Sequence, residues 1–141
     1  MKIDIEVLKN YLIVFQEYDS PVISTYELFI QLGLNHQKND DIKIVYHYLK
    51  ILYDQDLIDI ESNKPEDRQS LGITFGHSGI IMLSSKHFRL TNEGHKTLEI
   101  MLQSKIWNFT KSQLGTIGVE SIKQIPTIAL AFIKTQLPFP L

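Results

Sequence analysis

The stretch FRLTNEGHKTLEIMLQSKIW, Phe88 to Trp107, decides the fold because each part of it favours one local structure. Its first three residues alternate apolar and charged side chains, as a half-buried strand does. Thr91 follows, and its hydroxyl can accept a hydrogen bond from the next turn, so it is the predicted N-cap of a helix. The buried stripe of that helix is expected to be His95, Leu98, Met101 and Leu102. The stretch therefore predicts the last strand of a hairpin that runs directly into an amphipathic helix.

The chain before this stretch predicts three helices, because its apolar residues recur every three or four positions. They are expected over residues 3–18, 24–32 and 41–55. Ser24, with Glu27 three residues later, forms a capping-box pattern at the start of the second helix. Gly33 is suited to the left-handed position that ends it. Asn39 or Asp40 is the predicted cap of the third helix.

Short strands are predicted between the third helix and Phe88. Residues 57–60 alternate with period two, and residues 72–75 and 80–83 flank a Gly-His-Ser-Gly turn. The charged segment ESNKPEDRQS at 61–70 separates the first of these strands from the second. It is rich in turn formers and is expected to be a mobile loop. These segments predict a wing of three or four short strands, which is more elaborate than the minimal hairpin.

The motif RLTNEGH at 89–95, followed by KIW at 105–107 and an amphipathic C-terminal helix, resembles a family of uncharacterised proteins. Its members occur in bacteria, phages and mobile elements, and most read RLTWEGH followed by IW, whereas this chain has Asn92 in place of the tryptophan. The upstream YHYLKILYDQDLID is similar to the family's helix and Leu-Ile strand. The layout also resembles a second, phage-associated winged-helix family with an LTEKG turn. The resemblance implies a winged-helix domain and no particular activity.

The predicted fold is therefore α+β. A winged helix-turn-helix, with three helices and a β-hairpin wing, is expected over 1–102, and additional C-terminal helices over 103–141 should pack on it or form a dimer contact. Pro126 is expected to separate a short helix ending near Gln124 from a last helix that runs to Gln136. That last helix is apolar on most faces, which favours deep burial or a partner. Its predicted contact residues are Ile128, Leu130, Ala131, Phe132 and Ile133.

Composition argues against most chemistry. The 141 residues include no cysteine, which excludes disulfides and thiolate chemistry. The five histidines are scattered without a metal-ligand spacing, and the Gly-His-Ser-Gly turn lacks the strand-turn-helix context of a nucleophile. No signal peptide or membrane-length apolar run is evident, so a soluble, cytoplasmic protein is expected. The sequence predicts no enzyme, no metal and no cofactor.

Charge is unevenly distributed along the chain. Residues 1–67 carry six Lys and Arg against thirteen Asp and Glu, and residues 68–141 carry eight against three. A duplex-binding surface is usually basic where it meets phosphate. The half that contains the predicted helix-turn-helix is therefore the wrong sign for DNA.

Two functions remain as hypotheses. The first is a nucleic-acid-binding protein, such as a phage or mobile-element transcriptional regulator, that would bind double-stranded DNA with its third helix and wing. Its predicted contact residues are Lys43, Tyr46, His47, Lys50, Lys86 and Arg89. The alternative is a winged-helix protein-interaction module that binds a host factor, with a homodimer through the last helix also expected. A continuous positive surface on the third helix and wing would favour DNA, and carboxylates around that helix would favour a protein.

Overall fold

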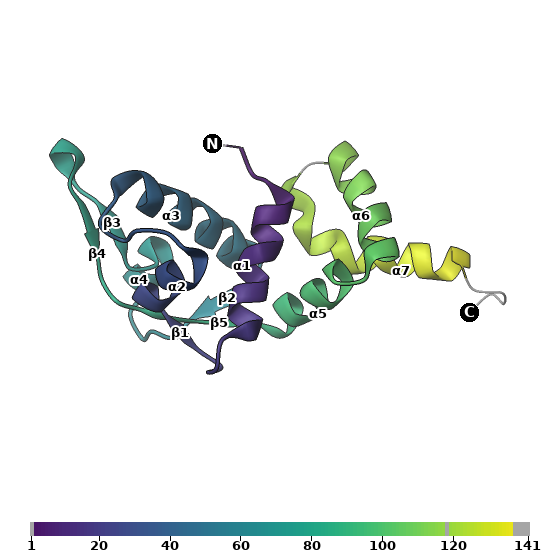
Figure 1. The fold of residues 1–141 in the computed structure, drawn as a ribbon, viewed down its shortest axis with the longest axis horizontal. Coiled ribbons are helices and arrows are strands. Elements are labelled where there is room, and N and C mark those ends of the chain that lie inside the picture. The colour runs from purple at the N-terminus through teal and green to yellow at the C-terminus, as the bar shows by residue number, and fades with distance from the viewer. Residues whose placement is uncertain (1, 118, 137–141) are drawn as a thin grey trace.

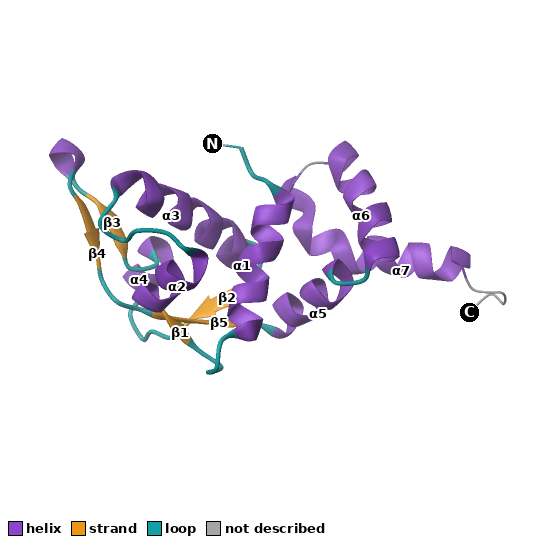
Figure 2. Ribbon diagram, in the orientation of Figure 1, coloured by secondary structure: helices purple, strands orange, loops and turns teal. Residues whose placement is uncertain are grey.

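The computed structural model describes residues 2–117 and 119–136, and it shows an α+β protein with two small antiparallel sheets (Figures 1 and 2). The first part consists of α1 (Ile5–Glu17), β1 (Ile23–Ser24), α2 (Thr25–Leu32), α3 (Asn39–Asp54) and β2 (Ile58–Ile60). Next come α4 (Pro65–Ser70), β3 (Ile73–Phe75), the 3-10 turn η1 (His77–Gly79), β4 (Ile81–Leu83) and β5 (His87–Leu90). The chain continues with α5 (Asn92–Met101), α6 (Ser104–Ile117), the 3-10 segment η2 (Val119–Gln124) and α7 (Ile125–Gln136). None of the helices in these described ranges is long and apolar enough to cross a membrane.

Strand β5 is the centre of the larger sheet, whose order is β1-β5-β2. Phe88 lies opposite Ile23 on one side and Ile60 on the other, and Leu90 lies opposite Ile58. Phe88 and Leu90 are buried while their neighbours along the strand are exposed, so the predicted half-buried strand is confirmed. β3 and β4 form a separate two-stranded sheet.

The junction between β5 and α5 is held by Thr91. Its hydroxyl accepts from the Gly94 N–H at 3.0 Å and donates to the Asp56 carbonyl at 2.6 Å, which confirms the predicted cap. A Cβ at Gly94 would lie 2.1 Å from the Leu57 carbonyl oxygen, so α5 approaches the β2 lead-in as closely as glycine permits. The predicted stripe is partly wrong, because this contact turns a different face of α5 inward. The buried residues are Gly94, Thr97, Leu98 and Met101, whereas His95 and Leu102 are exposed.

The upstream helices follow the predicted order with local differences. Ser24 accepts from the Glu27 N–H and Gly33 is left-handed at φ 71°, so both ends of α2 are confirmed. The predicted cap of α3 is wrong: the helix begins at Asn39 itself, and its N-cap Lys38 makes no side-chain capping bond. The Asn39 amide instead donates to the Gly79 carbonyl, forty residues away along the chain.

The predicted mobile loop at 61–70 is also wrong, because most of it forms the short helix α4. Pro65 occupies its first turn, where a missing N–H costs nothing. Asp67 is buried, accepts a hydrogen bond from Ser62, and pairs with Lys86 at 3.1 Å. Leu71 ends the helix in the left-handed region and is completely buried. Distant partners therefore order a segment whose composition favours a loop.

The C-terminal helices α6 and α7 pack on α5 and on each other, and side chains of α6 also bond to α1. Trp107 is buried, as expected, and its indole N–H donates to Glu6 Oε1 at 3.1 Å, while Lys111 Nζ meets the same oxygen at 2.8 Å. The predicted break before Pro126 is confirmed, since η2 ends at Gln124 and α7 begins at Ile125. The turn expected over 115–118 is wrong as far as it is described, because α6 continues to Ile117, and Gly118 lies outside the described residues.

Candidate interaction surface

Lys43 is the predicted contact residue that the structure leaves most available. It is exposed on α3, and its side chain makes no ion pair or hydrogen bond with any described residue. Its neighbour Asp40, one turn earlier, is exposed as well, so the start of α3 offers charges of both signs.

Tyr46 and Lys50 lie on the side of α3 that α4 and the β3–β4 hairpin cover. The Tyr46 ring packs edge-to-face against Phe75 of β3 at a centroid distance of 5.0 Å. Lys50 Nζ donates to the Gln69 carbonyl of α4 at 3.3 Å and lies 3.8 Å from Asp54 Oδ1. These two side chains therefore hold neighbouring elements against α3.

His47 is directed toward the interior side of α3. Its ring packs edge-to-face on Tyr48, which in turn stacks on Tyr11 of α1. Its Nε2 atom is buried and has no hydrogen-bond partner among the described residues. That nitrogen does not face a surface that a nucleic-acid base could reach.

Lys86 and Arg89 are both paired with carboxylates. Lys86 contacts Asp67, and both side chains are largely buried. Arg89 Nη2 lies 3.4 Å from Asp59 Oδ2, and Arg68 approaches the other oxygen of the same carboxylate at 3.1 Å. A phosphate could bind either predicted cation only by competing with an existing carboxylate.

The Asp67 site gives a prediction about acid stability. A hydrogen bond from Ser62, and then the contact with Lys86, lower the pKa of Asp67 although burial opposes them. Because the folded pKa lies below the unfolded value of about 3.9, this stabilisation is complete above that pH and is lost as the pH falls through the folded pKa. Asp67→Asn is expected to lower the melting temperature at pH 6 and to differ less from wild type at pH 2. Thermal unfolding of both proteins at pH 6 and at pH 2 measures this effect. An equal difference in melting temperature at the two pH values would contradict the prediction.

Part of the uneven charge of the sequence is neutralised within the molecule, because ion pairs join the two halves and engage Glu6, Asp56, Asp59 and Asp67. Of the seven ion pairs between described residues, five join an acid from residues 1–67 to a base from residues 68–141. The five cross-half pairs are Arg68–Asp59, Lys86–Asp67, Arg89–Asp59, Lys111–Glu6 and Lys123–Asp56. The acidic first half is thus complementary to the basic second half.

The β3–β4 hairpin is a surface that residue-by-residue reasoning missed. The fifteen residues 71–85, LGITFGHSGIIMLSS, include no Asp, Glu, Lys or Arg. Ile80 and Met82 are each 61% exposed and Phe75 is 45% exposed. The hairpin projects from the body beside α3 (Figure 1). The uncharged run was visible in the sequence, but only the structure shows that its apolar side chains reach solvent.

Gly72 and Asn39 fix where this hairpin points. Gly72 has φ +81°, and a Cβ there would lie 2.5 Å from the Ser84 carbonyl oxygen. The two arms of the hairpin therefore approach each other closely at its base. At the other end, the Asn39 amide holds the Gly79 carbonyl against the start of α3. The exposed apolar side chains are therefore presented on a hairpin anchored at both ends.

The predicted partner residues of α7 divide into two groups. Phe132 stacks on Phe109 of α6 at 4.7 Å, and Ile128 is half-buried against the core. The exposed members are Leu130, Ala131 and Ile133. The helix thus uses part of its apolar surface to hold α6 and leaves a smaller part in solvent.

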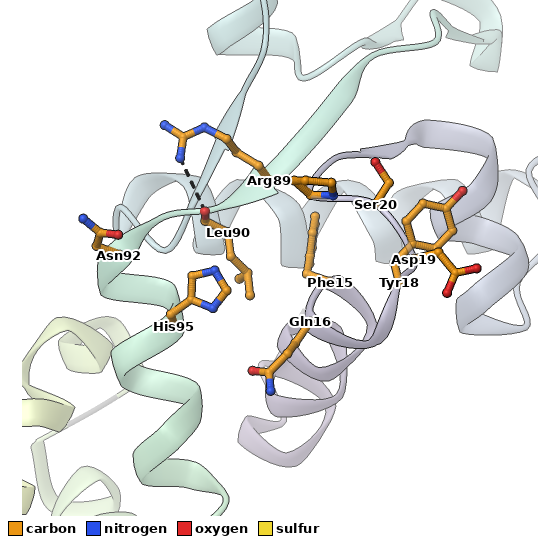
Figure 3. Close-up of a pocket in the computed structure, with 10 residues that line it drawn as sticks. Phe15, Gln16, Tyr18, Asp19, Ser20, Arg89, Leu90, Asn92 and His95 are labelled. Atoms are coloured by element: carbon orange, nitrogen blue, oxygen red, sulfur yellow. Dashed lines mark hydrogen bonds between the residues drawn. The ribbon is translucent and has the colours of Figure 1, made fainter.

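A groove of about 480 Å³ lies where the end of α1 meets β5 and α5 (Figure 3). Asn92 and His95 line it from α5, facing Tyr18 and Asp19 at the end of α1. The Arg89 guanidinium donates to the Leu90 carbonyl at its edge. The imidazole ring of His95 makes no hydrogen bond with any described residue, so the groove lacks the bonded pair that orients a catalytic histidine.

Comparison with family sequence models, curated proteins and solved structures found no match. The function is therefore inferred from the residues of this chain.

Proposed function

We propose that this chain is a winged-helix protein that acts by binding a protein partner through its β3–β4 hairpin, which takes the place of the wing. The order helix, strand, helix, helix, strand, hairpin, strand, with the short helix α4 inserted before the hairpin, supports the winged helix, as does the position of β5 between β1 and β2. In such a domain α3 and the hairpin form the usual contact surface.

The uncharged, solvent-exposed hairpin carries the proposal. A wing that binds nucleic acid supplies Lys or Arg to the phosphates, because phosphate contacts provide most of the affinity. Residues 71–85 supply none. Exposed apolar side chains such as Ile80 and Met82 instead gain free energy when a partner removes them from water.

The ion pairs around the hairpin support the same choice. Lys86 and Arg89 flank it on the sequence, and each is bound to a carboxylate. Lys50 on α3 is engaged with α4. Apart from Lys43, the predicted cations of α3 and of the hairpin's flank are engaged within the protein, and the hairpin exposes apolar groups, which is the composition of a protein-binding site.

A photo-crosslinking amino acid placed at Met82 tests this function in cells that make the protein. We expect a covalent adduct of discrete mass from position 82, because its side chain lies on the exposed face of β4. The matched control is Ile30, which is 63% exposed on α2. The adduct should also disappear when Ile80→Lys is added. No adduct at position 82, or the same adducts at position 30, would overturn the proposal.

Duplex binding remains a second candidate because of one observation. Lys43 is exposed on the helix that enters the major groove in winged-helix proteins, and it is not neutralised by any described carboxylate. The ion pairs between the two halves also neutralise four acids of the first half, Glu6, Asp56, Asp59 and Asp67. This candidate requires that Lys43→Glu abolish binding.

A further inference from the structure

The outer edge of β4 has free backbone hydrogen-bonding groups. Ser84 N–H donates to the Gly72 carbonyl, and Gly76 N–H donates to the Ile80 carbonyl. These two bonds show which opposite residues of β3 and β4 form the hydrogen-bonded pairs of the ladder. Because bonded and non-bonded pairs alternate in an antiparallel ladder, Met82 faces β3 with its backbone groups, and Ile81 and Leu83 direct theirs away from it. No backbone bond from another described element reaches Ile81 or Leu83.

This edge also lacks the features that keep exposed strands apart. Natural edge strands carry charged side chains, proline or a bulge, which block pairing with another chain. The segment from Ile80 to Ser85 contains no charged residue and no proline, and the register between β3 and β4 continues without a bulge. β3 pairs with the other edge of β4, on the side of α3, where Phe75 contacts Tyr46. The outer edge of β4 is therefore not covered by β3.

We propose that a second copy of this chain covers the edge, so that two β4 strands pair antiparallel about a twofold axis at Met82. Ile81 of each copy then bonds to Leu83 of the other, which satisfies the N–H and C=O groups that point outward. Met82 lies opposite Met82 of the second copy as a non-bonded pair, with Cα atoms about 4.5 Å apart. The two hairpins become one four-stranded sheet, ordered β3, β4, β4, β3.

Charge and symmetry favour a second copy as the occupant. A twofold contact places each residue against the same surface of its partner, so any charge near the axis would face itself. The absence of charge across residues 71–85 removes that repulsion. Ile80 and Met82 also lie on the same face, so their exposed side chains meet those of the second copy. This inference rests on the proposed use of the hairpin as a protein-binding surface.

A single introduced thiol tests the register, because the chain contains no cysteine. In Met82→Cys, the two thiols across the axis are expected at a Cα separation that suits a disulfide. We expect mild oxidation to convert most of this variant to a covalent dimer and to leave the equally exposed control Ile30→Cys monomeric. Equal or negligible crosslinking of the two variants would overturn the pairing at Met82.

Charge reversal tests the same contact without a covalent bond. Sedimentation should show wild-type dimers, and Met82→Lys and Met82→Glu should each weaken them at least about tenfold through like charges at the axis. An equimolar mixture of the two variants should restore dimers, whereas Ile30→Lys should have no effect. Circular dichroism confirms that each variant is folded. A monomeric wild type, or dimers insensitive to Met82→Lys, overturns the inference. If the photo-crosslink at Met82 then joins a different protein, the proposed protein-binding function stands and only the pairing of two copies is overturned.

Discussion

Replacing Gly94 with alanine is expected to lower the free energy of unfolding by about 3 kcal/mol, the upper part of the usual cost of overpacking. The new methyl group would lie 2.1 Å from the Leu57 carbonyl oxygen and 3.0 Å from a Leu90 methyl group. The first contact is with backbone, so it cannot be relieved by a rotamer change. Either α5 must move away from the β2 lead-in, or the Thr91 cap must distort.

Urea unfolding followed by circular dichroism measures this change, and Gly115→Ala is its matched control. Gly115 lies in α6, and a Cβ there meets nothing within 4 Å. Alanine should therefore stabilise the protein by up to about 1 kcal/mol through helix propensity. If Gly94→Ala were as stable as Gly115→Ala, the close approach of α5 to Leu57 would be wrong.

Replacing Trp107 with alanine is expected to cost about 4 kcal/mol, as for other buried aromatic side chains. The indole is 3% exposed, and its N–H is satisfied by Glu6 on α1. Alanine leaves a cavity between α6 and α1 and removes one of the two groups that bind the Glu6 carboxylate. The C-terminal helices should then detach more readily from the rest of the protein.

Two controls separate the parts of this effect. Trp107→Phe keeps an aromatic ring and loses the hydrogen bond, so it should cost less than the alanine variant. Lys111→Ala removes the other Glu6 contact, which is an exposed ion pair worth under about 1 kcal/mol. A Trp107→Ala loss no larger than that of Lys111→Ala in urea unfolding would show that the helices are not held by the buried indole.

The strand, cap and helix around Thr91 were predictable because their determinants are neighbours in sequence. Thr91 and Gly94 are three residues apart, and Phe88 and Leu90 alternate within one strand. The start of α3 and the helix α4 were not predictable in this way. Asn39 meets Gly79, and Asp67 meets Lys86, and neither contact is visible before the chain folds.

The same difference applies to the candidate site. The sequence correctly placed Lys43 and Lys50 on one helix, because helical periodicity is local. It could not show that Lys86 and Arg89 are neutralised by Asp67 and Asp59, which lie nineteen and thirty residues earlier. Charge counts along the chain do not reveal these pairs, although five of the seven ion pairs between described residues connect the two halves.

Titration of a labelled random duplex with the protein, at low and at moderate salt, tests most directly whether α3 and the hairpin form a surface that does not bind nucleic acid. Because Lys50, Lys86 and Arg89 are engaged within the protein and the hairpin is uncharged, the account predicts no binding at low salt. The positive charge added by Met82→Lys should not create binding that Lys43→Glu removes. Tight binding that weakens steeply with added salt, and that Lys43→Glu abolishes, would show phosphate contacts through α3 and contradict the account.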